Sequence, residues 1–307
     1  MMIIKQCFLS QYFQTRCVFF RRLCLLVCCL SLSGYTSANQ SVLTSLPATY
    51  LLTSQLLQGT DQSAVYLPSP RFSLNRHLSW FTSHQQEVAE KARSALAAVT
   101  IASIWPQDPI YPQVRQFNVH IVPIDAAQAI SPRAQAVASL RDKEGSLSPY
   151  VWLNPVNLTT MLNIISQDLQ QLFPQHAQRI ADNQSQSAAA ITALMLANQQ
   201  FLFDQEIESV VLLDPALLDF AAGYSLYVHG HLFKPELEWN QKDKNQLKQW
   251  VEQDPSAWVI ATRAQSKQLK QILPQFSRYL LVDPIQRFDR GFERTLPWQR
   301  WQFTLAN

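Results

Sequence analysis

Two histidines separated by one residue, His229 and His231, form the one local pair in the sequence with the spacing of metal ligands. Residues two apart on a β-strand face the same side of the sheet, so such a pair could hold half of a zinc site. Gly230 predicts that the strand ends between them and that His231 lies in a turn. The sequence offers no partners for the pair, and no acid or base at motif spacing that would support a metal-dependent hydrolase.

Two aspartates carry a second kind of signal. Asp214 and Asp283 each end a predicted strand, and a proline follows each of them. An acidic residue before a proline is typical of a helix N-cap, a role worth about 1 kcal/mol that would explain both residues by itself. Ligands of open parallel sheets, however, bind outside the carboxyl ends of the strands. Capping and metal binding therefore both stay open for these two carboxylates.

Other residues with ligand chemistry have ordinary explanations. His77 lies in a polar loop after the second predicted strand, where a histidine is commonly solvated. Its competitor His84 falls in the first turn of the helix predicted from Ser83, with Gln86 as the capping-box partner. Tyr150 precedes a short apolar run, where a core or hinge role is the common one.

The elements that must position these residues alternate along the chain. This alternation of strands and helices argues for parallel sheets with crossover helices. Strands are predicted at 48–54, 64–67, 97–103, 118–123, 209–214, 225–230, 257–262 and 278–283. Helices of the second half are predicted at 215–223, 241–253 and 265–273.

The middle of the chain has the clearest helix signals. Asn154 is a good N-cap, and Pro155 stands at the first helical position, where its missing N–H costs nothing. A second helix opens after Phe173 and Pro174 and continues to about Leu202 without glycine or proline. At about 1.5 Å per residue, a helix of about 30 residues is long enough to tie two domains together.

Three segments carry a family resemblance. The run Tyr-Val-Trp-Leu-Asn-Pro from Tyr150 resembles the His-Ile-Trp-Leu-Asp-Pro signature of the ZnuA-like zinc and manganese solute-binding proteins of ABC transporters. The segment from Pro174 to Asn183 resembles the Pro-Glu-Asn-Ala...Asn opening of that family's linking helix. The segment from Asp214 to Leu226 is similar to the family's His-Asp-Ala-Phe-Gly-Tyr-Phe-Ala...Tyr-Gly-Leu. The spacing across the three segments is more specific than any one of them.

The resemblance implies a fold and a function. The fold would be α/β with two lobes, each a small, mainly parallel four-stranded sheet with flanking helices, joined by one long linking helix, and with the ligand cleft between the lobes. The protein would not be an enzyme. It would be a periplasmic, monomeric protein that captures a divalent metal and delivers it to an ABC permease in the inner membrane, with no organic cofactor and no nucleic-acid partner.

The four positions that match the family's metal ligands are His77, Tyr150, Asp214 and Asp283. Two of the family's histidines are here Tyr150 and Asp214, and His77 is matched by spacing across a variable loop. Zinc is the metal that the family implies. A set of one imidazole, one phenol and two carboxylates is richer in oxygen, which moves the preference toward manganese or iron.

A second hypothesis starts from the same replacement of two of the family's ligand histidines. Loss of two histidines would suit a degenerate relative that keeps the fold and acts as an accessory or interaction protein, or that binds a small organic ligand. The loop 126–148, which is often rich in histidine in zinc-binding relatives, contains none here.

The N-terminus predicts export. Four basic residues precede or border an apolar run from Leu23 to Leu32, and Thr36-Ser37-Ala38 fits a small-residue cleavage site. The apolar run has ten residues, whereas a membrane span needs about 20. We expect a signal peptide that is cut after Ala38.

Cleavage would change the chemistry of the chain. All five cysteines precede the cut, so the exported chain would have no disulfide and no thiolate ligand. The formal net charge would fall from +3 to −1, which removes the electrostatic argument for nucleic acid. None of the six glycines lies in a phosphate-binding motif.

The C-terminal tail also shows a pattern. At the C-terminus, Trp301, Phe303 and Leu305 alternate with polar residues, which predicts an edge strand or a tail packed on the second lobe. Trp298 and Trp301 could stack a ligand, but anchoring the tail is the favoured role.

The predicted organisation of the chain has four parts. They are a signal peptide at 1–38, an N-terminal α/β lobe at 39–154, a helical segment with the linking helix at 155–205 and a C-terminal α/β lobe at 206–307.

Overall fold

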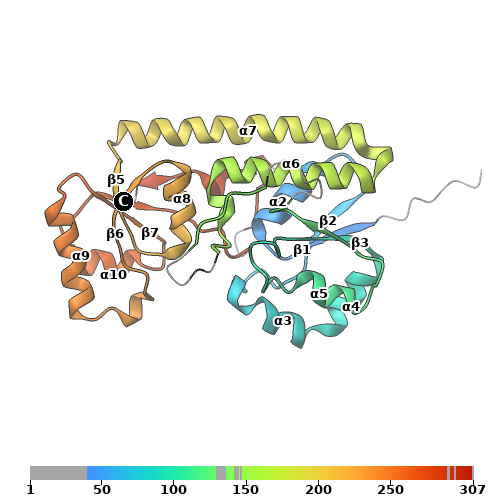
Figure 1. Cartoon of the computed structure of the whole chain (residues 1–307), viewed down its shortest axis with the longest axis horizontal. Helices are drawn as coiled ribbons and strands as arrows, with labels where there is room; N and C mark the ends of the chain where they lie inside the picture. Colours follow the sequence, from blue (N-terminus) through green and yellow to red (C-terminus); the bar gives the residue numbers. More distant parts are fainter. Residues whose placement is uncertain are drawn as a thin grey trace, which may run out of the picture. The chain divides into compact units, whose positions relative to one another are not determined.

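The first half of the chain forms a sheet of four parallel strands. The computed structural model describes residues 40–128, 136–141, 145, 147–288, 291–293 and 295–305, so the predicted signal peptide and much of the loop 126–148 lie outside it. The strands are β1 (Ser41–Thr44), β2 (Ser63–Tyr66), β3 (Ala95–Thr100) and β4 (Val122–Asp125), in the order β2-β1-β3-β4 (Figure 1). Thr44 pairs with Tyr66 and Val99, and Thr100 pairs with Asp125, so the carboxyl ends lie along one edge.

Helices of the first lobe differ in part from the expectation. They are α2 (Pro47–Leu56), α3 (His77–Ser83), α4 (Gln85–Ser94) and α5 (Ile110–Arg115). The strand predicted at 48–54 is wrong, because Pro47 starts α2 there and the first strand is β1. A short apolar run fits either element, and proline at the first helical position favours the helix. The capping box at Ser83 is also wrong, because α4 begins at Gln85 without a side-chain cap.

The second half of the chain confirms the predicted alternation. Its sheet contains β5 (Ser209–Leu212), β6 (Tyr227–His231), β7 (Trp258–Ala261), β8 (Tyr279–Leu281) and β9 (Thr304–Leu305), in the order β6-β5-β7-β8-β9. The helices are α8 (Leu218–Gly223), α9 (Gln241–Gln253) and α10 (Ser266–Ile272). Four strands are parallel, and β9 pairs antiparallel with β8. The predicted edge strand of the tail is thus present, but it is only two residues long.

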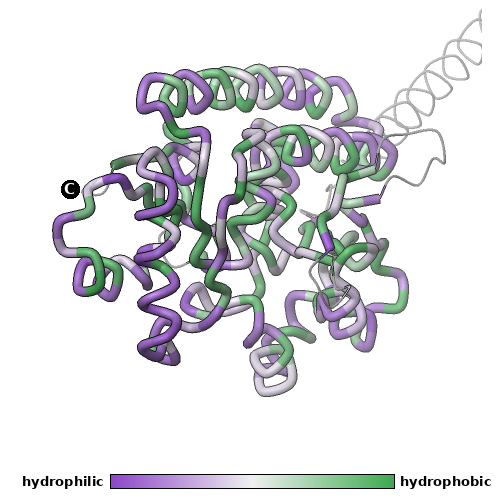
Figure 2. The backbone as a smooth tube through the Cα atoms, turned by 60° about the vertical axis from the view of Figure 1, so that its left-hand side comes forward, coloured by the Kyte–Doolittle hydropathy of each residue, from purple (hydrophilic) through white to green (hydrophobic). Residues whose placement is uncertain are grey.

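Two central helices follow the predicted signals. The Asn154 side chain accepts hydrogen bonds from the backbone N–H groups of Val156 and Asn157, which confirms it as the N-cap of α6 (Pro155–Leu172). The linking helix α7 (Ala177–Asp204) has 28 residues, or about 42 Å at the usual rise (Figure 1). Hydrophobic and hydrophilic residues alternate along its backbone, as expected for a helix with one packed face (Figure 2).

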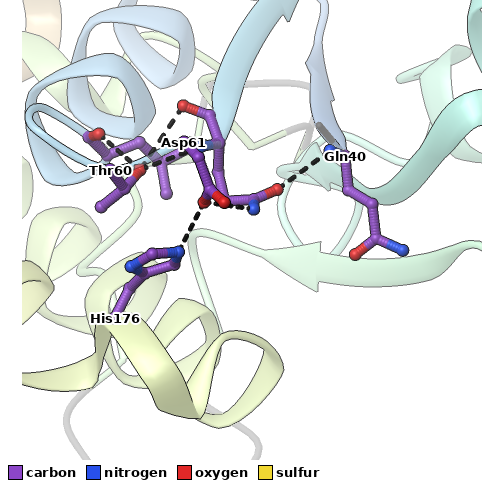
Figure 3. Close-up of polar contacts among 6 residues, drawn as sticks. Gln40, Thr60, Asp61 and His176 are labelled. Atoms are coloured by element: carbon purple, nitrogen blue, oxygen red, sulfur yellow. Dashed lines mark hydrogen bonds and ion pairs between the residues drawn. The ribbon is translucent and has the colours of Figure 1, made fainter. Parts of the chain in front are cut away.

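Polar contacts hold both ends of α7. At its start, His176 Nε2 lies 2.5 Å from Asp61 Oδ1, in the loop before β2 (Figure 3). About two turns further, the Asn183 side chain donates to the backbone carbonyls of Leu56 and Gln58, both at 2.8 Å. Near its end, Asn198 donates to the Trp301 carbonyl at 2.9 Å. The helix is therefore tied to the first lobe and to the C-terminal segment.

One hydrophobic core runs through both lobes. It includes Val42 and Trp152 on the first-lobe side, Ile191 in α7, and Val210 and Trp301 on the second-lobe side. A separate core covers the other face of each sheet. Within the described residues, none of the helices combines the length and apolar character needed to span a membrane.

Candidate metal site

Asp214 follows β5 at the carboxyl edge of the second-lobe sheet. Its Oδ1 accepts a hydrogen bond of 2.9 Å from the backbone N–H of Ala216, which confirms the predicted cap of a short 3-10 helix, Pro215–Leu217. Burial raises the pKa of Asp214, the Ala216 N–H opposes this shift, and the charge of Glu236 adds to it. The carboxylate is thus partly desolvated and lies near a second negative charge.

Tyr150 lies beside Asp214. Burial, with a smaller contribution from the charge of Asp214, raises the pKa of the Tyr150 phenol to about 12. The phenol is therefore protonated at neutral pH, and it donates to Gln286 Oε1 at 3.4 Å. Its ring packs edge-on against Trp152, with centroids 5.6 Å apart. Of the four predicted ligands, Tyr150 and Asp214 are thus close enough for the charge of one to act on the other, and Tyr150 also contacts the amide of Gln286.

Asp283 follows β8 at the same edge, but its carboxylate has partners. Oδ1 accepts from the backbone N–H of Ile285 at 2.8 Å, and Oδ2 accepts from Arg300 Nε at 3.0 Å. The predicted role as a helix cap is wrong, because the residues directly after it, 284–288, contain no helix. Ile285 has a φ of 53°, in the left-handed region, which turns the chain away from a right-handed helix.

His77 occupies a different environment from the one predicted. It begins α3 instead of lying in a polar loop, and it is fully buried. Neither ring nitrogen makes a hydrogen bond of good geometry to a described residue. Burial lowers the pKa of His77 to about 4, although the Phe72 backbone partly opposes the shift. The imidazole is therefore neutral at physiological pH.

His84, the alternative to His77 as a predicted metal ligand, contacts residues of the preceding helix α3. It lies at the junction of α3 and α4, one residue before α4 begins, so the predicted place in the first helical turn is slightly wrong. Its ring stacks on Trp80 at 4.8 Å, and Nδ1 lies 2.9 Å from the Trp80 carbonyl and from Ser83 Oγ. These contacts engage Nδ1 of the ring with residues of α3.

The pair His229 and His231 lies within β6, so the prediction that Gly230 ends the strand is wrong. The pairing with β5 shifts between Val228 and Gly230, which leaves His229 as an extra residue. Such a bulge breaks the alternation that would place both rings on one face. A glycine is needed at 230 because a Cβ there would lie 2.6 Å from the Trp250 indole.

Further contacts separate the two rings. His231 packs against Phe233 at 4.6 Å, whereas His229 lies near Asp254. Across the described ranges, no three histidine, cysteine, aspartate or glutamate side chains form a group that could hold a metal ion.

Carboxylates at the first-lobe edge are saturated with hydrogen bonds. Asp108 is buried and accepts from Ser45 Oγ, Thr100 Oγ1 and the backbone N–H groups of Ile101 and Ile110, at 2.7–3.2 Å. Asp125, at the end of β4, accepts from the N–H and hydroxyl of Ser103 and from the Ala127 N–H. These groups fix the loops of the first lobe and offer little to a ligand.

Sequence reasoning missed two charged residues near the second-lobe edge. Asp219 is buried in α8, and burial raises its pKa to about 6 against a hydrogen bond from the Ser148 side chain. Arg300 has a side chain only 10% exposed and pairs with Asp283. An aspartate inside the apolar run of 216–222 was a signal for a buried carboxyl, but no motif marked Arg300.

Comparison with known proteins agrees with this fold. Residues 83–291 match the model of the family described as ZnuA, zinc-uptake complex component A, periplasmic. No curated protein matches the sequence.

Similar solved structures include a crystal structure of ZnuA, with 18% identity and a TM-score of 0.60 over 80% of this chain and 91% of that one. A Zn(II)-bound ZnuA-like domain of Streptococcus pneumoniae AdcA has 15% identity and a TM-score of 0.63 over 86% and 96%. The Ni2+ complex of FpvC from P. aeruginosa has 13% identity and a TM-score of 0.58 over 81% and 88%. At these identities the likeness shows the fold.

The matched segment spans more than half of the chain and contains β3 to β8, both central helices, and Tyr150, Asp214 and Asp283. Its fold, two parallel sheets joined by a long helix, is that of the solved structures. The chain belongs to the ZnuA family of periplasmic solute-binding proteins, the zinc-uptake component A.

Proposed function

We propose that this protein captures a divalent metal ion at the second-lobe edge and delivers it to an ABC permease. The family match supports this role, and the observation that carries it is the placement of Asp214 after β5 and Asp283 after β8, the two strands that flank β7, at one edge of the sheet. Tyr150 and Gln286 add two oxygen groups beside them. Desolvated oxygens near a second negative charge favour a bound cation.

The proposed ligands are Tyr150, Asp214 and Asp283, with His77 as the fourth position by family. Asp214 is the strongest candidate, since one hydrogen bond to Oδ1 leaves acceptor capacity on its carboxylate. Tyr150 serves as a neutral oxygen or hydrogen-bond donor, because the pKa of about 12 keeps its proton. His77 would have to leave its buried place in α3 to take part.

Zinc is the proposed metal by family, with manganese or iron as the alternatives that oxygen ligands favour. Solved members of this fold include a Zn(II)-bound domain and an Ni2+ complex. We propose further that the mature chain starts at Asn39 after export, acts as a monomer in the periplasm and carries no catalytic activity.

Metal analysis of the purified mature protein, with thermal unfolding in zinc, manganese and iron, tests the proposal. A ligand that binds only the folded state at 100 times its Kd stabilises it by about 2.7 kcal/mol, so moderate affinity is measurable. We expect a shift with at least one of these metals. Edman sequencing of periplasmic protein should begin at Asn39, and an uncut cytoplasmic product would contradict the export.

A second function has its own supporting observation. Arg300 already neutralises Asp283, and His77 and His84 have local roles, which suits a relative that keeps the fold for an accessory role or for a small organic ligand. The absence of any thermal shift with the three metals would favour this second function.

A further inference from the structure

The chain after β8 returns across the molecule before it forms β9. We call its described residues 284–288, 291–293 and 295–303 the C-terminal strap. The strap begins directly after Asp283 and ends at the edge strand β9. It is therefore held at both ends by the second-lobe sheet.

Hydrogen bonds fix the strap to the centre of the molecule. Trp152 Nε1 donates to the Pro284 carbonyl at 3.1 Å, and Trp301 Nε1 donates to the Trp152 carbonyl at 2.8 Å. Asn198 of the linking helix donates to the Trp301 carbonyl. All three donor side chains belong to buried residues, so solvent does not compete for these bonds.

Aromatic rings fix the strap to the first lobe. Phe288 stacks on Tyr66 at the end of β2, with centroids 4.5 Å apart, and packs edge-on against Tyr50 of α2 at 4.8 Å. Phe292 stacks on the same Tyr50 ring, with centroids 6.5 Å apart. Each such pair contributes about 0.5–1.5 kcal/mol beyond its buried area. The strap thus bridges the two lobes through side chains that the family motifs do not include.

Arg300 places a positive charge of this strap on the candidate metal site. Its guanidinium donates to Asp283 Oδ2 at 3.0 Å and lies over the Phe292 ring, 5.2 Å from the centroid. Its Nη1 is buried and has no hydrogen-bond partner among the described residues. Asp283 and Arg300 also line the same small pocket, together with Trp301. The carboxylate of Asp283, one of the four positions that match the family's ligands, is therefore already paired with the Arg300 guanidinium.

We propose that Arg300 competes with a divalent cation for Asp283 and thereby couples metal capture to the C-terminal strap. This inference rests on the proposed function of the same edge. A guanidinium and a metal ion cannot both occupy the oxygen that Arg300 holds, because two cations at ligand distance repel strongly. Metal binding through Asp283 Oδ2 requires Arg300 to leave, which loosens the strap near Trp301. Arg300 thereby lowers the affinity for the metal, and the mobility of the strap depends on whether the metal is bound.

Zinc titration by calorimetry on the mature protein tests the competition. We expect Arg300→Gln, which removes the charge, to bind zinc at least ten times more tightly than the natural protein. Arg300→Lys keeps the charge and should bind like the natural protein. Arg287→Gln is the matched control, because Arg287 lies in the same strap but is exposed. It should leave the zinc affinity unchanged.

Hydrogen–deuterium exchange in chelator-treated protein gives a second readout that does not depend on metal. Exchange of residues 295–303 should be at least several times faster in Arg300→Gln than in the natural protein or in Arg287→Gln. Unchanged exchange would overturn the role of Arg300 in holding the strap, whatever the metal result. Retained protection of β5 and β7 in the same experiment shows that the variant is folded.

The outcomes separate this inference from the proposed function. Zinc binding by Arg300→Gln alone would support the competition and contradict metal capture by the natural protein. Equal affinities of the natural protein and Arg300→Gln would overturn the competition and leave metal capture standing. Absence of zinc binding in every variant would overturn both.

Discussion

The carboxyl edges of the two sheets differ in how their carboxylates are satisfied. At the first-lobe edge, Asp108 accepts four hydrogen bonds from side chains and backbone of the surrounding loops. At the second-lobe edge, Asp214 accepts one backbone hydrogen bond at Oδ1, and Asp219 has a buried Oδ2 without a partner among the described residues. Both edges lie where parallel sheets bind ligands, and unsatisfied oxygens favour a ligand more than oxygens that already accept hydrogen bonds. Asp283, also at the second-lobe edge, accepts from a backbone N–H and from Arg300.

This difference separates structural from functional carboxylates. A saturated buried carboxylate is part of the fold, because its removal leaves several donors unpaired. A desolvated carboxylate with few donors is costly to the fold when ionised, and that cost is reduced when a cation binds. The comparison therefore predicts opposite effects of substitution at the two edges.

The largest effect is expected at Asp108. Asp108→Ala would leave the hydroxyls of Ser45 and Thr100 and two backbone N–H groups unpaired in the core, so the free energy of unfolding should fall by about 4 kcal/mol. Urea denaturation measures this loss. Asp182→Ala, at an exposed site in α7, is the control and should stay within about 0.5 kcal/mol of the natural protein. Equal effects of the two substitutions would contradict the structural role of Asp108.

His77 should make the first lobe sensitive to acid. Its pKa is about 4 in the folded protein against 6.5 as the ordinary value, so the unfolded chain binds the proton more tightly. Stability should therefore fall as the pH decreases from 6.5 to 4, by up to about 3 kcal/mol. In His77→Leu this part of the pH dependence should be missing from denaturation curves. An identical pH dependence would mean that His77 is not buried in its neutral form.

Asp219 should give the second lobe the opposite pH dependence, with stability that falls as the pH rises. Its pKa is raised from 3.8 to about 6, so the folded state binds the proton more tightly and stability falls as the pH rises through this window. Asp219→Asn should be about 2 kcal/mol more stable than the natural protein at pH 8, and the gain should vanish near pH 4. A destabilised variant at pH 8 would show that the hydrogen bond from Ser148 outweighs the cost of burying the ionised carboxylate.

Two substitutions of Asp214 distinguish its role as a helix cap from a role as a metal ligand. Asn caps a helix about as well as Asp, so Asp214→Asn should leave stability nearly unchanged, whereas Asp214→Ala should cost about 1 kcal/mol. If Asp214 is a ligand, Asp214→Asn should still weaken metal binding severely. Thermal unfolding with and without zinc measures both properties. Unchanged zinc affinity in Asp214→Asn would reduce this residue to a cap.

Much of the fold could be predicted from the sequence. The Asn154 cap, the linking helix and the second-lobe alternation follow from local rules, since caps and uninterrupted periodicity act within a few residues. The misplaced first strand shows the limit, because the apolar run that forms α2 fits either element and only Pro47, at the first helical position, favours the helix.

The candidate site was less accessible from the sequence. Position within the family identified Asp214, which the structure places beside Tyr150. Burial of His77 and the pairing of Arg300 with Asp283 depend on residues far apart in the chain, so no local pattern indicates them. The bulge that separates His229 from His231 likewise arises from the pairing of β6 with β5.

Calorimetric zinc titration of Asp214→Asn combined with Asp283→Asn tests the central claim most directly. The carboxylates of the second-lobe edge should be ligands, so the double variant should bind zinc at least 100 times more weakly than the natural protein, about 2.7 kcal/mol. Asp125→Asn, at the first-lobe edge, should leave the affinity unchanged. Zinc binding by the double variant with the affinity of the natural protein would contradict the assignment of the metal site to this edge.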